Sequence, residues 1–194
     1  MFMHSKVASA QRPARGVALH ATPPSQVHPS KPSRPAKHKP ELIDRLLSIK
    51  ESSGKTFSAI AKEVGCTNVY LAQLMYNQAQ LKPAYVDKLK CALPGLSDED
   101  IADMQRAPMR RFDPELIQEP LVYRFYEAVM HNGEALKAII NEECGDGIMS
   151  AIDMYATVDQ VEGKYGERRV VVTLNGKYLP FIIQDSADNV ANRD

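Results

Sequence analysis

The chain has 194 residues, of which 44% are hydrophobic, so it can bury the core of one ordinary domain or of two small ones. Its formal net charge is zero, but residues 1–40 hold seven of the 24 basic side chains and no acidic one. The rest of the chain is therefore acidic. Since no apolar run approaches the roughly 20 residues that a membrane helix needs, we expect a soluble protein with no membrane partner.

Histidine and cysteine usage excludes several kinds of active site. Four of the five histidines lie in the first 40 residues, which leaves His131 alone in the acidic part. A histidine-rich metal site, a Ser-His-Asp triad or a Cys-His pair would have to use this single side chain. Cys66, Cys91 and Cys144 are odd in number and far apart, which favours reduced intracellular thiols over disulfides or a zinc knuckle.

Residues 1–40 form a basic extension with seven prolines. Such a composition cannot bury enough apolar surface to offset the entropy of ordering, so we expect disorder. An organellar transit peptide has a similar composition, and a plain linker or extension remains the alternative. The compartment is accordingly cytoplasmic, or mitochondrial or plastid if the segment is a targeting signal.

Residues 41–107 are predicted to form a bundle of short helices with glycine and proline between them. The expected helices are 41–52, 57–64 with Thr56 as N-cap and Gly65 as terminator, 67–76, 83–93, and a short one capped by Ser97. Segment 56–74 is similar to a repressor-type helix-turn-helix. Its second helix has no Lys or Arg and the surrounding chain is acidic, which favours a scaffold over the alternative, a DNA-binding regulator.

The acidic residues Asp98, Glu99 and Asp100 follow Ser97 directly. They could suggest a metal site, but acidic side chains favour the first turn of a helix, so a solvated helix N-terminus is the preferred interpretation. Residues 108–119 are bounded by prolines and lack periodicity, and they are predicted to be a linker.

Residues 120–184 are predicted to form a small α+β domain, followed by a tail at 185–194. A helix from Leu121 to about Ile140 is expected, interrupted at residues 131–133. Three strands are expected, at 150–155, 168–174 and 177–183, with Asn175-Gly176 as a hairpin turn between the last two. A unit this small cannot cover both faces of its sheet, so we expect it to intertwine with a partner subunit.

Polar residues in this domain interrupt an apolar pattern. Arg124 and Glu127 share one helix face, and Ser150 follows the glycine pair Gly145-Asp-Gly. The Arg charge, the Ser hydroxyl and free backbone N–H groups together describe a pocket for a small planar anion. A surface ion pair and a serine bonded to a neighbouring carbonyl are the simpler alternatives.

Four motifs of this chain resemble cyanase (cyanate hydratase, cyanate lyase). In order they are Leu-Val-Tyr-Arg-Phe-Tyr-Glu, Gly-Glu-Ala-Leu-Lys-Ala-Ile-Ile-Asn-Glu, Gly-Asp-Gly-Ile-Met-Ser-Ala-Ile-Asp and Leu-Asn-Gly-Lys-Tyr-Leu-Pro, and the similarity covers roughly residues 42–180. The resemblance implies a repressor-like helical half and an α+β half.

The resemblance also implies a function. It implies decomposition of cyanate with bicarbonate to ammonia and carbon dioxide through carbamate, without metal or organic cofactor. The charge pattern of segment 56–74, separately, leads us to expect no nucleic-acid partner. The family's catalytic residues fall on Arg124, Glu127 and Ser150. A homodecamer built as a ring of five dimers is implied, with sites between subunits, so Ser150 is expected to reach the anion across a subunit boundary and a monomer to be inactive.

Overall fold

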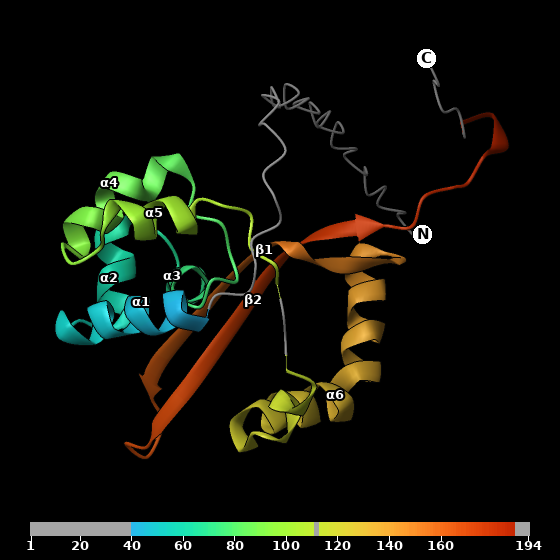
Figure 1. Cartoon of the computed structure of the whole chain (residues 1–194). Helices are drawn as coiled ribbons and strands as arrows, with labels where there is room; N and C mark the ends of the chain where they lie inside the picture. Colours follow the sequence, from blue (N-terminus) through green and yellow to red (C-terminus); the bar gives the residue numbers. More distant parts are fainter. Residues whose placement is uncertain (1–39, 111–112, 189–194) are drawn as a thin grey trace, which may run out of the picture. The chain divides into compact units, whose positions relative to one another are not determined.

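The computed structural model describes residues 40–110 and 113–188 (Figure 1), and the expectation of a disordered or targeting extension at residues 1–39 lies outside them. The chain runs through helices and then two strands, an α+β layout. In order, the elements are α1 Pro40–Ser52, α2 Phe57–Val64, α3 Asn68–Met75, α4 Pro83–Ala92, α5 Asp98–Met104, η1 Pro114–Gln118, α6 Pro120–Cys144, β1 Gly147–Glu162, β2 Arg168–Pro180 and η2 Ser186–Asp188.

Local capping explains where the short helices begin and end. The Thr56 hydroxyl accepts from the N–H of Ala59 and starts α2, and Gly65 ends it in the left-handed conformation at φ 83°. The Thr67 hydroxyl caps α3 in the same way, through the N–H of Tyr70. The predicted helices of residues 41–104 are therefore confirmed nearly to the residue.

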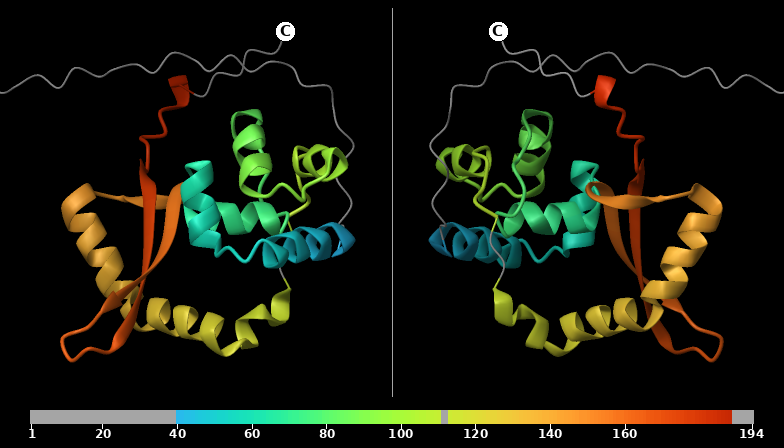
Figure 2. Two further views of the ribbon diagram at one scale, coloured as in Figure 1. Left: turned by 90° about the vertical axis from the view of Figure 1, so that its left-hand side faces the viewer. Right: turned by 90° about the vertical axis from the view of Figure 1, so that its right-hand side faces the viewer.

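The buried core lies within helices α1–α5 and their connections, which gather into one bundle (Figure 2). Its members are apolar side chains that recur at helical spacing on the inward faces. They are Leu42, Leu46, Ile60, Ala61, Val64, Leu71, Leu74, Met75, Ala79, Leu81, Leu89, Ala92, Leu93, Leu96, Ile101 and Met104.

The N-terminus of α5 is solvated at Asp98 and Glu99, as the sequence suggested, but not at Asp100. Asp100 is buried at 4% exposure, where it completes a capping box with Ser97 and accepts from the Arg45 guanidinium on α1 at 2.9 Å. Burial alone would raise the pKa of this carboxyl, but the hydrogen bonds from Ser97 and Arg45 outweigh burial and leave the pKa below its usual value. Asp100 therefore joins α5 to α1.

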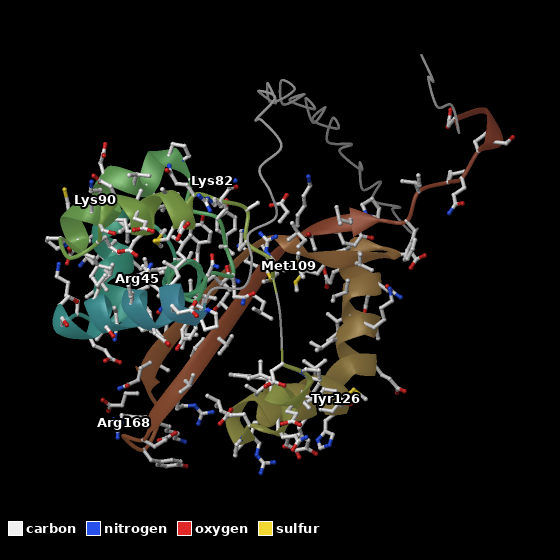
Figure 3. The ribbon with its side chains drawn as sticks, viewed as in Figure 1. Arg45, Lys82, Lys90, Met109, Tyr126 and Arg168 are labelled. Carbon is white, nitrogen blue, oxygen red and sulfur yellow. The ribbon has the colours of Figure 1, made fainter. Side chains whose placement is uncertain are left out.

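Strands β1 and β2 form one antiparallel hairpin, so the predicted division into three strands is wrong. The chain reverses at residues 163–167, near Arg168 in Figure 3, where the N–H of Gly163 bonds to the carbonyl of Glu167. Asn175 and Gly176, predicted to be the turn, instead pair with Tyr155 and Met154 inside the ladder. The long-range register of two extended strands overrides the local turn preference of Asn-Gly.

Helix α6 is continuous over 25 residues, so the predicted interruption at 131–133 is wrong. Figures 1 and 2 show instead that α6 bends part of the way along its length. Within the described residues the helix buries no side chain, and large apolar residues such as Val129 (59%) and Ile139 (58%) are exposed. Apart from its contact with η1, its apolar face is therefore left exposed in a single chain.

Within residues 40–110 and 113–188, no helix has the length and apolarity that are needed to cross a bilayer.

Candidate anion-binding site

The N-terminal half of α6 holds an arginine between an acid and an aromatic ring. Arg124 donates from Nη1 to Oε2 of Glu127 at 2.6 Å, and its guanidinium carbon lies 5.8 Å from the centroid of the Tyr123 ring. Tyr126, labelled on α6 in Figure 3, pairs with Tyr123 at a centroid distance of 6.2 Å. Glu127 and Tyr123 therefore orient the guanidinium. Arg124 and Glu127 share one helix face, as their i,i+3 spacing predicted.

The electrostatics of this pair keep the arginine charged. The hydrogen bond from Arg124 to Glu127 and the carboxylate's charge raise the pKa of the guanidinium above its usual value. The Arg124 side chain is 69% exposed and that of Glu127 is 33% exposed. Because Glu127 engages one terminal nitrogen, the other N–H groups of the planar guanidinium can meet an anion.

Ser150 lies where β1 leaves its regular pairing with β2. The residue is buried at 8% exposure, and its Oγ accepts from the N–H groups of Ile152 at 3.1 Å and Asp153 at 2.9 Å. These bonds occupy the two lone pairs of the hydroxyl, so its own proton is left to donate. The simpler alternative, a serine bonded to a neighbouring carbonyl, is not what the described residues show, because both of the hydroxyl's partners there are N–H donors.

The turn between α6 and β1 depends on glycine. Gly145 has φ 91° and ψ −169°, a conformation that only glycine adopts readily. Its N–H bonds to the carbonyl of Asn141 at 3.0 Å, so this group is not available to an anion as the sequence had suggested. The site's donors in this chain are therefore side chains rather than the Gly145 N–H.

Sequence reasoning missed a lysine that fixes this turn. Lys137 on α6 donates to the carbonyl of Gly147 at 3.1 Å and lies 3.6 Å from the Asp146 carboxylate. No sequence signal marks this contact, because it depends on how the chain reverses at Gly145. The bond ties the end of α6 to the start of the strand that carries Ser150.

The structure brings Arg124 and Glu127 together but does not join them to Ser150. Within the described part of the chain, the Ser150 hydroxyl forms a hydrogen bond with neither side chain of the pair. Among the same residues, no three His, Cys, Asp or Glu side chains group in a way that could hold a metal ion.

The helix-turn-helix-like segment contacts the hairpin rather than standing free. The Asn68 carboxamide at the start of α3 donates to the carbonyl of Val158 at 2.7 Å and accepts from its N–H at 3.1 Å. The side chain thus bonds to β1 as a neighbouring strand would. The end of α3 that would read bases in a repressor is occupied by β1.

The fold and the site define an α+β protein with a repressor-like helical bundle and a hairpin domain that carries candidate anion-binding side chains. Residues 114–182 match the family model described as the cyanate lyase C-terminal domain. A cyanate hydratase of Arabidopsis thaliana is 60% identical over 144 residues, which cover 74% of this chain and 86% of the relative. A cyanate hydratase of Phaeodactylum tricornutum is 55% identical over 150 residues, covering 77% and 78%.

A solved structure, the cyanase from T. urticae, shares the fold with a TM-score of 0.64 at 31% identity, covering 73% of this chain and 98% of the other. The chain belongs to the cyanase (cyanate hydratase, cyanate lyase) family, as its motifs suggested, and is an enzyme of the lyase class.

Proposed function

We propose that the chain decomposes cyanate with bicarbonate, using Arg124, Glu127 and Ser150. The observation that carries the proposal is that the Arg124 guanidinium, bonded to Glu127, and the Ser150 hydroxyl, whose lone pairs accept from two N–H groups, both lie within the segment that matches the cyanate lyase model. Relatives that are named cyanate hydratases support the substrate.

The proposed reaction balances without a redox partner. An oxygen of bicarbonate bonds to the electrophilic carbon of cyanate, and the nitrogen takes up the bicarbonate proton and one proton from solution. The bond between this oxygen and the former bicarbonate carbon then breaks, which releases carbon dioxide and leaves carbamate. Carbamate takes up one more proton and falls apart to ammonia and a second carbon dioxide. Bicarbonate is a co-substrate, and the proposed chemistry calls on no organic cofactor or metal.

Each side chain has a distinct proposed role. Two anions repel one another, so a site that unites them must supply positive charge and fixed donors. Arg124 supplies the positive charge, and its planar guanidinium suits small anions. Ser150 donates a hydrogen bond to the anion from its hydroxyl. Glu127 orients Arg124 through the 2.6 Å bond and takes no proton itself.

The site is completed, we further propose, by a second copy of the chain in a homodecamer of five dimers. The apolar face of α6 is exposed. The hairpin has only two strands, and an isolated two-stranded hairpin is at best marginally stable in water. Residues 120–184 would be the catalytic dimerisation domain and residues 41–107 the supporting bundle. Pairing of two such domains would cover the exposed side chains and bring Ser150 to the Arg124 of another subunit.

An ammonia-release assay with cyanate, run with and without bicarbonate, tests the reaction. Ammonia that appears only when both anions are present, with two carbon dioxide molecules for each ammonia, would support the proposal. Release that is independent of bicarbonate, or no release at all, would contradict it. Binding to duplex DNA that weakens as salt rises would instead favour the regulator that the helix-turn-helix-like segment left open.

A further inference from the structure

The hairpin is irregular at one place only among its described pairs, and Ser150 lies there. Met149 pairs with Tyr178 and Met154 pairs with Gly176, so residues 150–153 of β1 face a single residue of β2, Lys177. The additional residues bulge out of the ladder. Hydrogen bonds from the N–H groups of Ile152 and Asp153 to Ser150 Oγ close this bulge.

Gly176 packs against the first residue of the bulge. A Cβ added at Gly176 would meet the carbonyl oxygen of Ser150 and would come within 2.5 Å of Cγ of Met149. A side-chain atom such as the Met149 Cγ can move aside, but a backbone carbonyl can do so only if the bulge shifts. Unlike Gly145, Gly176 does not have a positive φ. Glycine is therefore required here for space and not for backbone conformation.

Lys177 holds the opposite end of the bulge. Its ammonium lies 3.7 Å from the carboxylate of Asp153, the last residue before regular pairing resumes. The bulge is thus bounded by a close backbone approach at Ser150 and by an ion pair at Asp153. Of the two, only the approach at Gly176 acts on the residue that carries the hydroxyl.

We propose that Gly176 is a positioning residue for Ser150: the absence of a side chain lets β2 pass against the Ser150 carbonyl and so sets where the hydroxyl points. The inference rests on the proposed function, because it takes Ser150 as the donor to the substrate. The sequence predicted that Gly176 forms a hairpin turn; we infer instead that it helps to position Ser150.

Gly176→Ala tests the inference, measured as kcat/KM for cyanate at saturating bicarbonate together with the size of the assembly. We expect the assembly to persist and kcat/KM to fall about 10- to 100-fold, since a displacement of about 1 Å is enough to cost this much. Gly133→Ala is the matched control, because a Cβ at that helical glycine meets nothing within 4 Å and should leave activity unchanged.

A double-mutant cycle separates positioning from general structure. If Gly176 acts through the hydroxyl, adding Gly176→Ala to Ser150→Ala should cost little beyond Ser150→Ala alone. Full activity of Gly176→Ala, an equal loss in both backgrounds, or loss of the assembly would each overturn the inference. A parent chain that releases no ammonia from cyanate would instead refute the proposed function, and this inference with it.

Discussion

Arg124 is the residue on which the proposed chemistry depends most. The guanidinium bonds to Glu127 and lies over the ring of Tyr123, and its hydrogen bond to Glu127 raises its pKa above the usual value. In a single chain Arg124 and Glu127 form an exposed ion pair, as the simpler alternative from the sequence has it, and the same exposure leaves the guanidinium open to an anion. The i,i+3 spacing predicted the contact because it is local.

Replacing Arg124 by Lys should lower kcat by about 100-fold while leaving the assembly intact, since a point charge lacks the planar fork. Steady-state ammonia release and size-exclusion chromatography measure the two effects. Arg169→Lys is a matched control, because Arg169 forms a similar exposed ion pair with Glu167 at the hairpin turn. Full turnover by Arg124→Lys would refute the anion-binding role.

At the scale of elements, local signals were sufficient for the helical bundle and insufficient for the hairpin. Thr56, Gly65 and Ser97 act within one turn of their own positions, so their sequence patterns predicted the helix ends correctly. The Asn175-Gly176 pair gives a strong turn signal, but the register of β1 against β2 decides its place. The bulge at Ser150 likewise depends on residues of a distant strand, so it could not be predicted.

The link between α5 and α1 gives a prediction about pH. Because the native pKa of Asp100 lies below that of the unfolded chain, about 3.9, its carboxylate stabilises the fold fully above that pH, and the contribution is lost as pH falls through the native pKa. Asp100→Asn should therefore lower the free energy of unfolding by about 1–3 kcal/mol at neutral pH, and the difference should shrink in acid.

Urea denaturation of Asp100→Asn and of the parent chain, at neutral pH and at successively lower pH, measures this difference. Asp98→Asn is the control, because the Asp98 carboxylate is 93% exposed and water screens its pair with Lys90, so we expect little change in stability. A deficit for Asp100→Asn that stays constant into acid would show that its charge does not act as described.

At the scale of the whole molecule, a single chain leaves a large apolar surface exposed outside the bundle. The bundle buries its own core, whereas among the described residues α6 buries no side chain and the hairpin exposes apolar side chains such as Val170 (70%) and Ile152 (94%). The small size of the domain led to the expectation of a partner subunit, and the exposed apolar surface is consistent with it. The sequence could not indicate which side chains a partner covers, since that depends on how two chains pack.

Ile139→Lys should separate assembly from folding. A charge on the exposed apolar face of α6 should dissociate the assembly and abolish ammonia release, while the bundle of α1–α5 keeps its helical circular dichroism. Sedimentation velocity measures the assembly, and Glu134→Lys, a charge on an exposed polar position of the same helix, is the control. A monomeric Ile139→Lys chain with normal turnover would contradict the shared site.

The most direct test of the account is complementation between two inactive variants. Arg124→Lys and Ser150→Ala are each expected to release little ammonia from cyanate and bicarbonate. Assemblies that contain both chains, produced by co-expression, should regain a readily measured part of the parent activity, because some sites then combine an intact Arg124 from one subunit with an intact Ser150 from another. Mixed assemblies as inactive as either variant alone would contradict a site shared between subunits.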